Sequence, residues 1–96
     1  MSEKDEYTEK FVAELDVVQA RLDEMKNQRK KLAADAQIRH ARQVEDLQRM
    51  ADATKAKLKE MAEADDDAWN LLKDGVENIW GDLQSTLENT VATFKE

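Results

Sequence analysis

The sequence predicts an all-α protein in which a long coiled-coil helix is followed by a shorter amphipathic helix that folds back, with copies of the chain associating. Proline is absent and glycine occurs only twice in 96 residues, so the usual markers of strands and tight turns are missing. Apolar residues recur at helical spacing in both parts of the chain. A chain of this length buries a sizeable core only if its helices fold back or associate.

The first predicted segment, residues 1–63, is a heptad-patterned helix. Ser2 is a suitable N-cap, and the acidic residues that follow it favour a helix start because carboxylates are stabilised near a helix N-terminus. One apolar seam, with spacings that alternate between four and three, ends at Ala36, and a second begins at His40. The residues expected to pack between helices and to mediate self-association are Phe11, Leu15, Val18, Leu22, Met25, Leu32, Val44, Leu47, Leu58 and Met61.

The second seam is one residue out of step with the first. This phase change indicates either a skip residue within one helix or a turn between two antiparallel helices near residues 33–40. The stretch from Lys31 to Arg39 consists of good helix formers, with no Gly, Pro or Asn among them. We therefore expect one continuous helix over about residues 4–62.

Residues 64–67, Ala-Asp-Asp-Asp, predict a corner between two helices. Three successive carboxylates compete with the backbone for hydrogen bonds and are suited to capping a helix that begins near Ala68. A calcium loop would space its oxygen ligands along a glycine-containing turn and end in a Glu, and this stretch lacks that pattern. We expect helix capping here and no metal site.

The third predicted segment, residues 68–96, is an amphipathic helix with an eleven-residue repeat. Trp69, Trp80 and Val91 occupy corresponding positions in successive repeats. Eleven residues are close to three helical turns, so corresponding residues stack on one face. The apolar face expected for this helix consists of Trp69, Leu72, Val76, Trp80, Leu83, Leu87, Val91 and Phe94.

The two tryptophans have two interpretations. Large rings eleven residues apart suit an anchor at a lipid surface, but helices that bind anionic lipid are usually rich in Lys and Arg, and the polar side of this one is mainly acidic. We prefer packing in a protein core, the usual role of an apolar helix stripe. Gly75 and Gly81 lie next to this face and would let another backbone approach closely.

Two polar residues fall on the seams. Arg29 is expected to lay its methylene groups along the seam and to place its guanidinium in water, with a role in fixing helix register as the alternative. His40 is the only histidine, and we expect it to be exposed. The alternatives are a proton-sensitive packing position and a metal ligand, the latter without a second His or any Cys to assist.

Charge is distributed in blocks along the chain. Residues 1–25 carry three basic and eight acidic side chains, residues 26–59 carry ten and four, and residues 60–96 carry two and ten. We do not expect the basic middle to bind nucleic acid, because it lacks interleaved aromatic residues and is flanked by acidic blocks. With no Cys, no secretory-type start and no apolar run longer than three residues, the expected location is the cytoplasm.

Several of these features occur together in one known family. The acidic start Asp5-Glu6-Tyr7, a Lys/Ala/Glu-type heptad middle and the segment Ala68-Trp-Asn-Leu-Leu-Lys-Asp-Gly-Val-Glu77 make the chain similar to small bacterial coiled-coil proteins described as stress-response proteins. That family often has a small residue and Gly before its Asp-Ala-Trp, where this chain has Asp65 and Asp66. The resemblance implies a bacterial cytosolic protein with a link to stress and brings no catalytic residues.

The sequence offers no site chemistry. It contains no Ser-His-Asp arrangement and no glycine-rich phosphate loop, so we expect no enzymatic activity and no cofactor. It predicts a noncatalytic interaction or structural protein that forms homo-oligomers, with another protein as a further possible partner. The alternative is a peripheral membrane or lipid-surface protein that acts through the Trp-bearing C-terminal helix.

Overall fold

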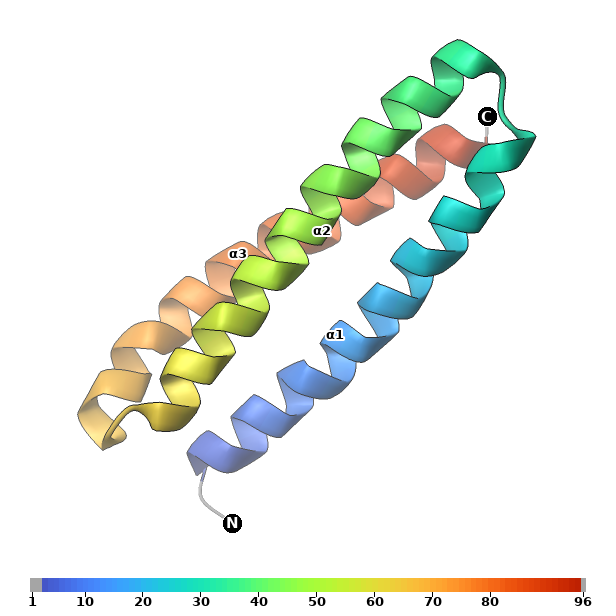
Figure 1. The fold of residues 1–96 in the computed structure, drawn as a ribbon. Coiled ribbons are helices and arrows are strands. Elements are labelled where there is room, and N and C mark those ends of the chain that lie inside the picture. Colours follow the sequence, from blue (N-terminus) through green and yellow to red (C-terminus); the bar gives the residue numbers. More distant parts are fainter. Residues whose placement is uncertain (1–2, 96) are drawn as a thin grey trace.

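The chain forms three helices arranged up, down and up in a short rod (Figure 1). A computed structural model describes residues 3–95, and the side chains of residues 3–92. Helix α1 spans Glu3–Gln28, a short 3₁₀ turn η1 spans Arg29–Lys31, α2 spans Ala34–Glu63 and α3 spans Asp66–Lys95. The described residues contain no strand, and the rod measures 50 × 19 × 18 Å. The all-α prediction is therefore confirmed, as is the folding back of the C-terminal helix.

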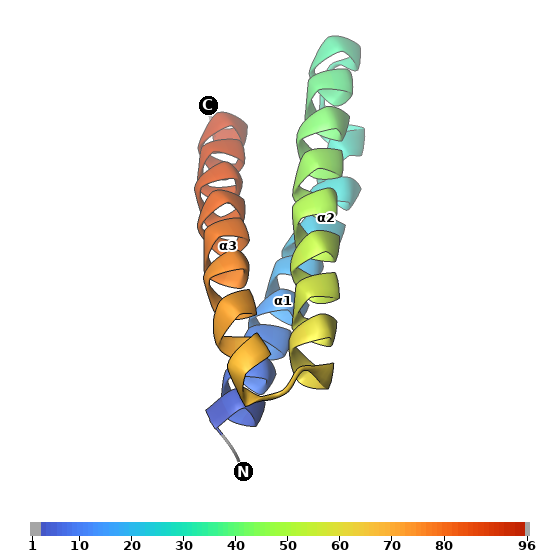
Figure 2. The same cartoon turned by 90° about the vertical axis from the view of Figure 1, so that its left-hand side faces the viewer.

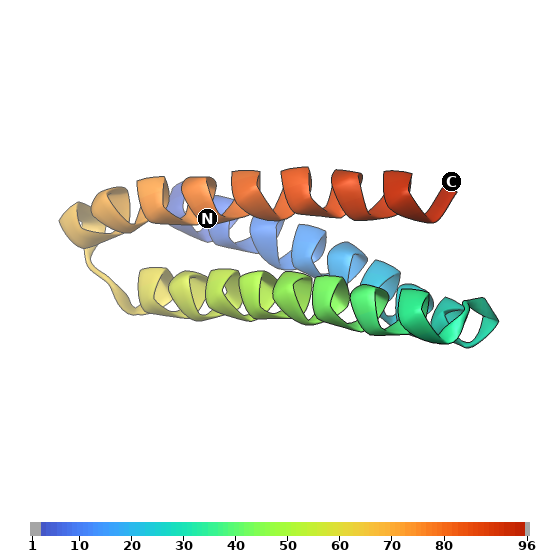
Figure 3. The same cartoon turned by 90° about the horizontal axis from the view of Figure 1, so that it is seen from above.

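The long continuous helix over residues 4–62 is wrong, because the chain reverses direction at residues 29–33 (Figures 1 and 3). Leu32 and Ala33 have extended backbone angles, with φ and ψ of −94° and 154° and of −63° and 157°. None of the described residues has a positive φ. The turn therefore needs neither Gly nor Pro, and it begins before the interval 33–40 in which the alternative interpretation placed it.

The reversal is favoured by burial of the two seams against each other. Replacing a continuous helix by a turn at these residues forfeits only a few tenths of a kcal/mol of helix propensity per residue. Burying a Leu, Val, Phe or Met side chain contributes about 1.5–3 kcal/mol. Three hydrogen bonds lie at the turn. The Leu32 backbone N–H donates to the Arg29 carbonyl at 3.1 Å, and Gln37 donates through Nε2 to the Leu32 carbonyl and through its backbone N–H to the Ala33 carbonyl, both at 2.8 Å.

The predicted acidic corner is confirmed in position and in its capping chemistry. Only Ala64 and Asp65 lie between α2 and α3, and α3 begins at Asp66 rather than near Ala68. The Asp65 carboxylate accepts a hydrogen bond from the Ala68 backbone N–H at 2.8 Å, which is an N-cap interaction. Lys4 of α1 donates to the Ala64 carbonyl at 2.9 Å and so links the start of the chain to this corner. The predicted N-cap Ser2 lies outside the described residues.

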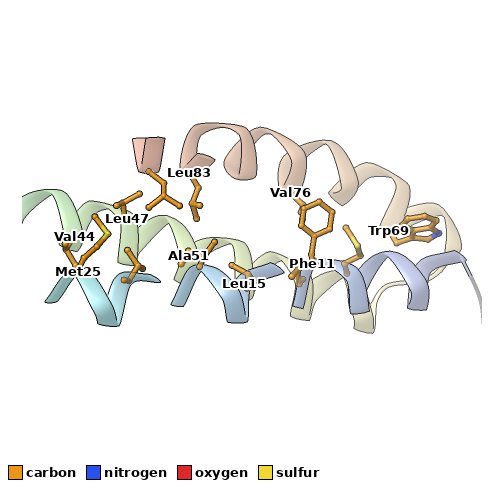
Figure 4. Packing of buried hydrophobic residues seen from close by; sticks show 14 residues of the cluster. Phe11, Leu15, Met25, Val44, Leu47, Ala51, Trp69, Val76 and Leu83 are labelled. Carbon is orange, nitrogen blue, oxygen red and sulfur yellow. The ribbon is translucent and has the colours of Figure 1, made fainter. Parts of the chain in front are cut away.

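Figure 2 shows the three helices along the rod, and the hydrophobic core lies between them (Figure 4). Trp69 lies at the end of the core near the corner, and Met25 and Val44 lie toward the α1–α2 turn (Figure 4). Helix α2 packs against both α1 and α3, and aromatic side chains link α1 to α3. The fold is therefore a helical hairpin with a third helix packed on it.

Candidate functional site

The residues predicted to mediate self-association are mostly buried within a single chain. Of the ten, nine are at most 8% exposed, and only Leu32, beside the turn, is half-buried. The second seam is buried at every position, including Thr54, whose hydroxyl donates to the Met50 carbonyl at 2.9 Å. These side chains form the interface between α1, α2 and α3, so they are not free to contact a second copy in this fold.

The apolar face of α3 packs with a seven-residue period instead of the expected eleven. Trp69, Val76 and Leu83 are buried, and the next member of this series is Thr90, which is 2% exposed and was not predicted. The Thr90 hydroxyl donates to the Thr86 carbonyl at 2.8 Å, which lets a polar residue occupy an apolar position. Of the other predicted residues, Leu87 is buried, whereas Leu72, Trp80 and Val91 are half-buried; the Phe94 side chain lies outside the described residues.

Four aromatic side chains join α1 to α3 near the corner. The Tyr7 ring lies 4.9 Å from the Phe11 ring and 5.9 Å from the Trp69 ring, measured between centroids. The Phe11 ring meets the Trp80 ring edge to face at 5.4 Å. Such pairs contribute about 0.5–1.5 kcal/mol beyond the burial of their area. The preferred core role of Trp69 is confirmed by its 6% exposure, and Tyr7 is a partly buried residue that packs against this core and that seam periodicity did not identify.

Charged groups on α3 surround the Tyr7 hydroxyl. It donates a hydrogen bond to Glu77 Oε1 at 3.3 Å, and the Lys73 Nζ lies 5.4 Å from the Tyr7 ring and 5.6 Å from the Trp69 ring. Burial and the nearby carboxylates of Glu77 and Asp74 raise the pKa of Tyr7 to about 12. The phenol therefore stays protonated at neutral pH and acts as a hydrogen-bond donor between the helices.

His40 is buried at the start of α2, so the expectation of an exposed side chain is wrong. It is 2% exposed, and the Arg29 Nε donates to its Nδ1 at 3.3 Å across the turn. Burial, with a smaller contribution from the Arg29 charge, lowers the pKa of His40. Arg29 is half-buried and contacts a partner instead of only placing its head in water. The pair connects the end of α1 to the start of α2.

A groove between α1 and α2 lies on the side of the hairpin away from α3. It has a volume of about 600 Å³ and is lined by Thr8, Val12, Asp52, Lys55, Ala56, Leu58, Lys59 and Ala62. A smaller hollow continues it toward Gln19, whose amide exchanges two hydrogen bonds with that of Gln48 at 3.1 and 2.8 Å. Val12 is 47% exposed within the groove. Its walls are largely apolar and small, which suits another helix better than a polar substrate.

The two ends of the rod carry an excess of opposite charges. Residues 3–10 and 60–67, which meet at the corner, carry nine acidic and two basic side chains. Residues 29–42, which form the turn at the other end and are called the hairpin tip below, carry five basic and one acidic side chain. Lys55, Lys57 and Lys59 of the basic block lie close to the acidic end, and Asp23 and Glu24 of the first acidic block lie close to the hairpin tip.

Neither a metal centre nor a membrane span is found in the part of the chain that the structure describes. Within it, no three or more His, Cys, Asp or Glu side chains are placed to hold a metal ion. No described helix combines the length and the apolar character needed to cross a bilayer. Gly75 and Gly81 face open space, because a Cβ added at either would meet nothing within 4 Å. Within the described chain, no other backbone approaches these glycines, and an approach by a second chain stays a prediction.

Comparisons of the chain with models of known families, with curated proteins and with solved structures find no match. The resemblance to small bacterial coiled-coil stress-response proteins therefore stays a prediction.

Proposed function

We propose that the protein is a noncatalytic interaction module that forms a dimer, with the α1–α2 groove of each copy covered by the hairpin of the other. The observation that carries this proposal is the groove itself, which is the largest apolar hollow described above and lies on a face that α3 leaves uncovered. Its lining includes the small, exposed residues Ala56 and Ala62, beside which a helix can approach closely. Exposed Val12 would then be buried.

Charge complementarity favours a second copy as the occupant. Exposed Asp16 lies on the α1 side of the two hollows, and exposed Glu9 is two helical turns before it on the same face of α1. The α2 side carries exposed Lys55 and Lys59, together with Asp52. A two-fold axis parallel to the rod places α1 of one copy over α2 of the other at the same height. Since Gln19 pairs with Gln48, Glu9 would lie level with the partner's Lys59, and Asp16 would lie beside the partner's Asp52, with Lys55 about one turn farther along.

The dimensions of the rod are sufficient for such a dimer. One face of 50 × 19 Å corresponds to about 950 Å², and a stable interface buries about 800 Å² on each partner. The seams would remain inside each chain and the groove would supply the contact between copies. The function is then to present a paired helical scaffold to other proteins, without chemistry of its own.

Sedimentation of two matched variants tests the proposal. Val12 and Val17 are both exposed residues of α1, but Val17 lines a hollow between α1 and α3 instead of the α1–α2 groove. We expect a dimer for the unmodified chain at micromolar concentration and for Val17→Glu, and a monomer for Val12→Glu. A monomeric unmodified chain, or a dimer that Val12→Glu leaves intact, would overturn the proposal.

A charge swap tests the orientation of the two copies. Lys55→Glu with Lys59→Glu should weaken the dimer, because like charges then face each other across the interface. Adding Glu9→Lys and Asp16→Lys to the same chain should restore it. Failure of this rescue, in a chain that is still helical, would reject the two-fold arrangement.

A further inference from the structure

The hairpin tip carries a dense group of exposed cations. Lys30, Lys31, Arg39 and Arg42 are all exposed, and Arg29 is half-buried against His40. Asp35 is the only acidic side chain among residues 29–42. Just below the tip, Lys26 lies 3.9 Å from Asp23 and is not counted with this group. The tip therefore has a net charge of about +4 at neutral pH, with Arg protonated throughout.

An exposed aliphatic side chain lies among these cations. Ile38 is 60% exposed, and it is one helical turn from Arg42 on the same side of α2. Leu32, at the turn, is half-buried. A large apolar side chain that the fold leaves in water, next to several cations, is typical of surfaces that contact both phosphate groups and acyl chains.

We propose that the hairpin tip docks end-on to an anionic lipid surface. Lys30, Lys31, Arg39 and Arg42 would contact lipid phosphates and carboxylates, and Ile38 would enter the boundary between headgroups and acyl chains. This site is distinct from the Trp-bearing face of α3, because Trp69 is buried and Trp80 packs on Phe11. It is also distinct from the α1–α2 groove proposed above for the dimer.

The acidic character of the whole chain does not oppose this docking. The acidic pole lies at the other end of a rod 50 Å long, whereas charges in solution are screened over about 8 Å at physiological ionic strength. A lipid surface that the tip approaches end-on is therefore exposed mainly to the cations. The formal charge of −7 for the chain conceals this local difference.

The tip is less suited to nucleic acid. Residues 29–42 contain no Phe, Tyr or Trp on which a base could stack, and the ring of His40 is buried. Recognition of single strands relies on such stacking, and the exposed Ile38 would gain little from a phosphate backbone. An anionic membrane uses both the cations and the aliphatic side chain.

Vesicle co-sedimentation tests the proposal with matched variants. The unmodified chain should pellet with vesicles of phosphatidylcholine and phosphatidylserine and should not pellet with phosphatidylcholine alone. Lys30→Gln with Lys31→Gln should lower partitioning at least tenfold, since each cation near an anionic surface contributes about a fivefold gain. The control Lys10→Gln with Lys57→Gln removes the same charge away from the tip and should change partitioning less than twofold.

A second pair of matched variants tests the contact of Ile38 with the lipid. Ile38→Gln should weaken partitioning several-fold, whereas Leu71→Gln, at a residue of α3 that is 81% exposed, should not. Tryptophan emission should stay unchanged on binding, because neither indole enters the lipid. Absence of pelleting with phosphatidylserine, an equal loss in both charge variants, a blue shift of the emission, or tighter binding to duplex DNA than to vesicles at the same salt would each overturn the proposal.

Discussion

The two connections between helices, residues 29–33 and residues 64–65, are both short but are specified differently. The α2–α3 corner is built from Asp65, whose carboxylate caps α3. The α1–α2 turn has Ala33 at the corresponding N-cap position, where no side-chain bond caps α2. The corner is therefore encoded by local chemistry, and the turn by the packing of the helices on either side. In the sequence, the α2–α3 corner is indicated by its Asp residues. The α1–α2 turn is indicated only by the one-residue shift between the two apolar seams.

The largest expected effect comes from weakening the packing that holds the turn closed. Leu47 is fully buried between the helices, so Leu47→Ala should lower the free energy of unfolding by about 2–5 kcal/mol. Chemical denaturation followed by circular dichroism measures this loss. A loss below about 1 kcal/mol would show that the turn is not held by seam packing. The control is Ala20→Ser at an exposed residue of α1, which should change the free energy of unfolding by less than about 0.5 kcal/mol.

Substitutions at the two N-cap positions should have opposite signs. Asp65→Ala removes the cap of α3 and should cost about 0.5–2 kcal/mol, whereas Ala33→Ser supplies a missing cap to α2 and should stabilise the chain by about 0.5–1 kcal/mol. Thermal unfolding of both variants measures the difference. If Ala33→Ser destabilises the fold, residue 33 is not an N-cap position at which a serine hydroxyl can bond to α2.

The stability of the turn should depend on pH through His40. Its pKa is lowered in the folded chain because burial, and next the Arg29 charge, disfavour the imidazolium. The unfolded chain therefore binds a proton at His40 more readily than the folded chain does. The contribution of neutral His40 to the free energy of unfolding is complete above the ordinary His pKa of about 6.5, and it is lost as pH falls from there toward the folded pKa. Denaturation between pH 8 and 5 should show this loss, and His40→Gln should reduce it. An unchanged pH slope in the variant would assign the effect to other groups.

The smallest expected effects come from the two glycines of α3. Gly75→Ala and Gly81→Ala should each stabilise the chain by about 0.5–1 kcal/mol, because alanine has the higher helix propensity and its Cβ meets no neighbour. Shifts in thermal midpoint measure the gain. Destabilisation at either residue would indicate that a second chain packs there in solution.

The sequence was sufficient to predict what depends on periodicity and local capping. The buried residues of both seams and the capping role of the acidic corner follow from spacing and from side-chain chemistry. The turn at residues 29–33 was not predicted as the preferred structure, because extended Leu32 and Ala33 carry no residue-type signal. The burial of His40 depends on Arg29 across that turn, and the burial of Thr90 depends on a hydroxyl satisfied within its own helix.

The most direct test of the account is a distance between α1 and α2 in solution. The chain has no Cys, so spin labels can be placed by Ala20→Cys and Glu45→Cys, at two exposed residues in the middle of the helices. Electron spin resonance on labelled protein diluted with unlabelled protein should give a separation of roughly 10–20 Å, the value for labels on adjacent helices. A separation of about 37 Å, the length of 25 residues of continuous helix, would contradict the hairpin.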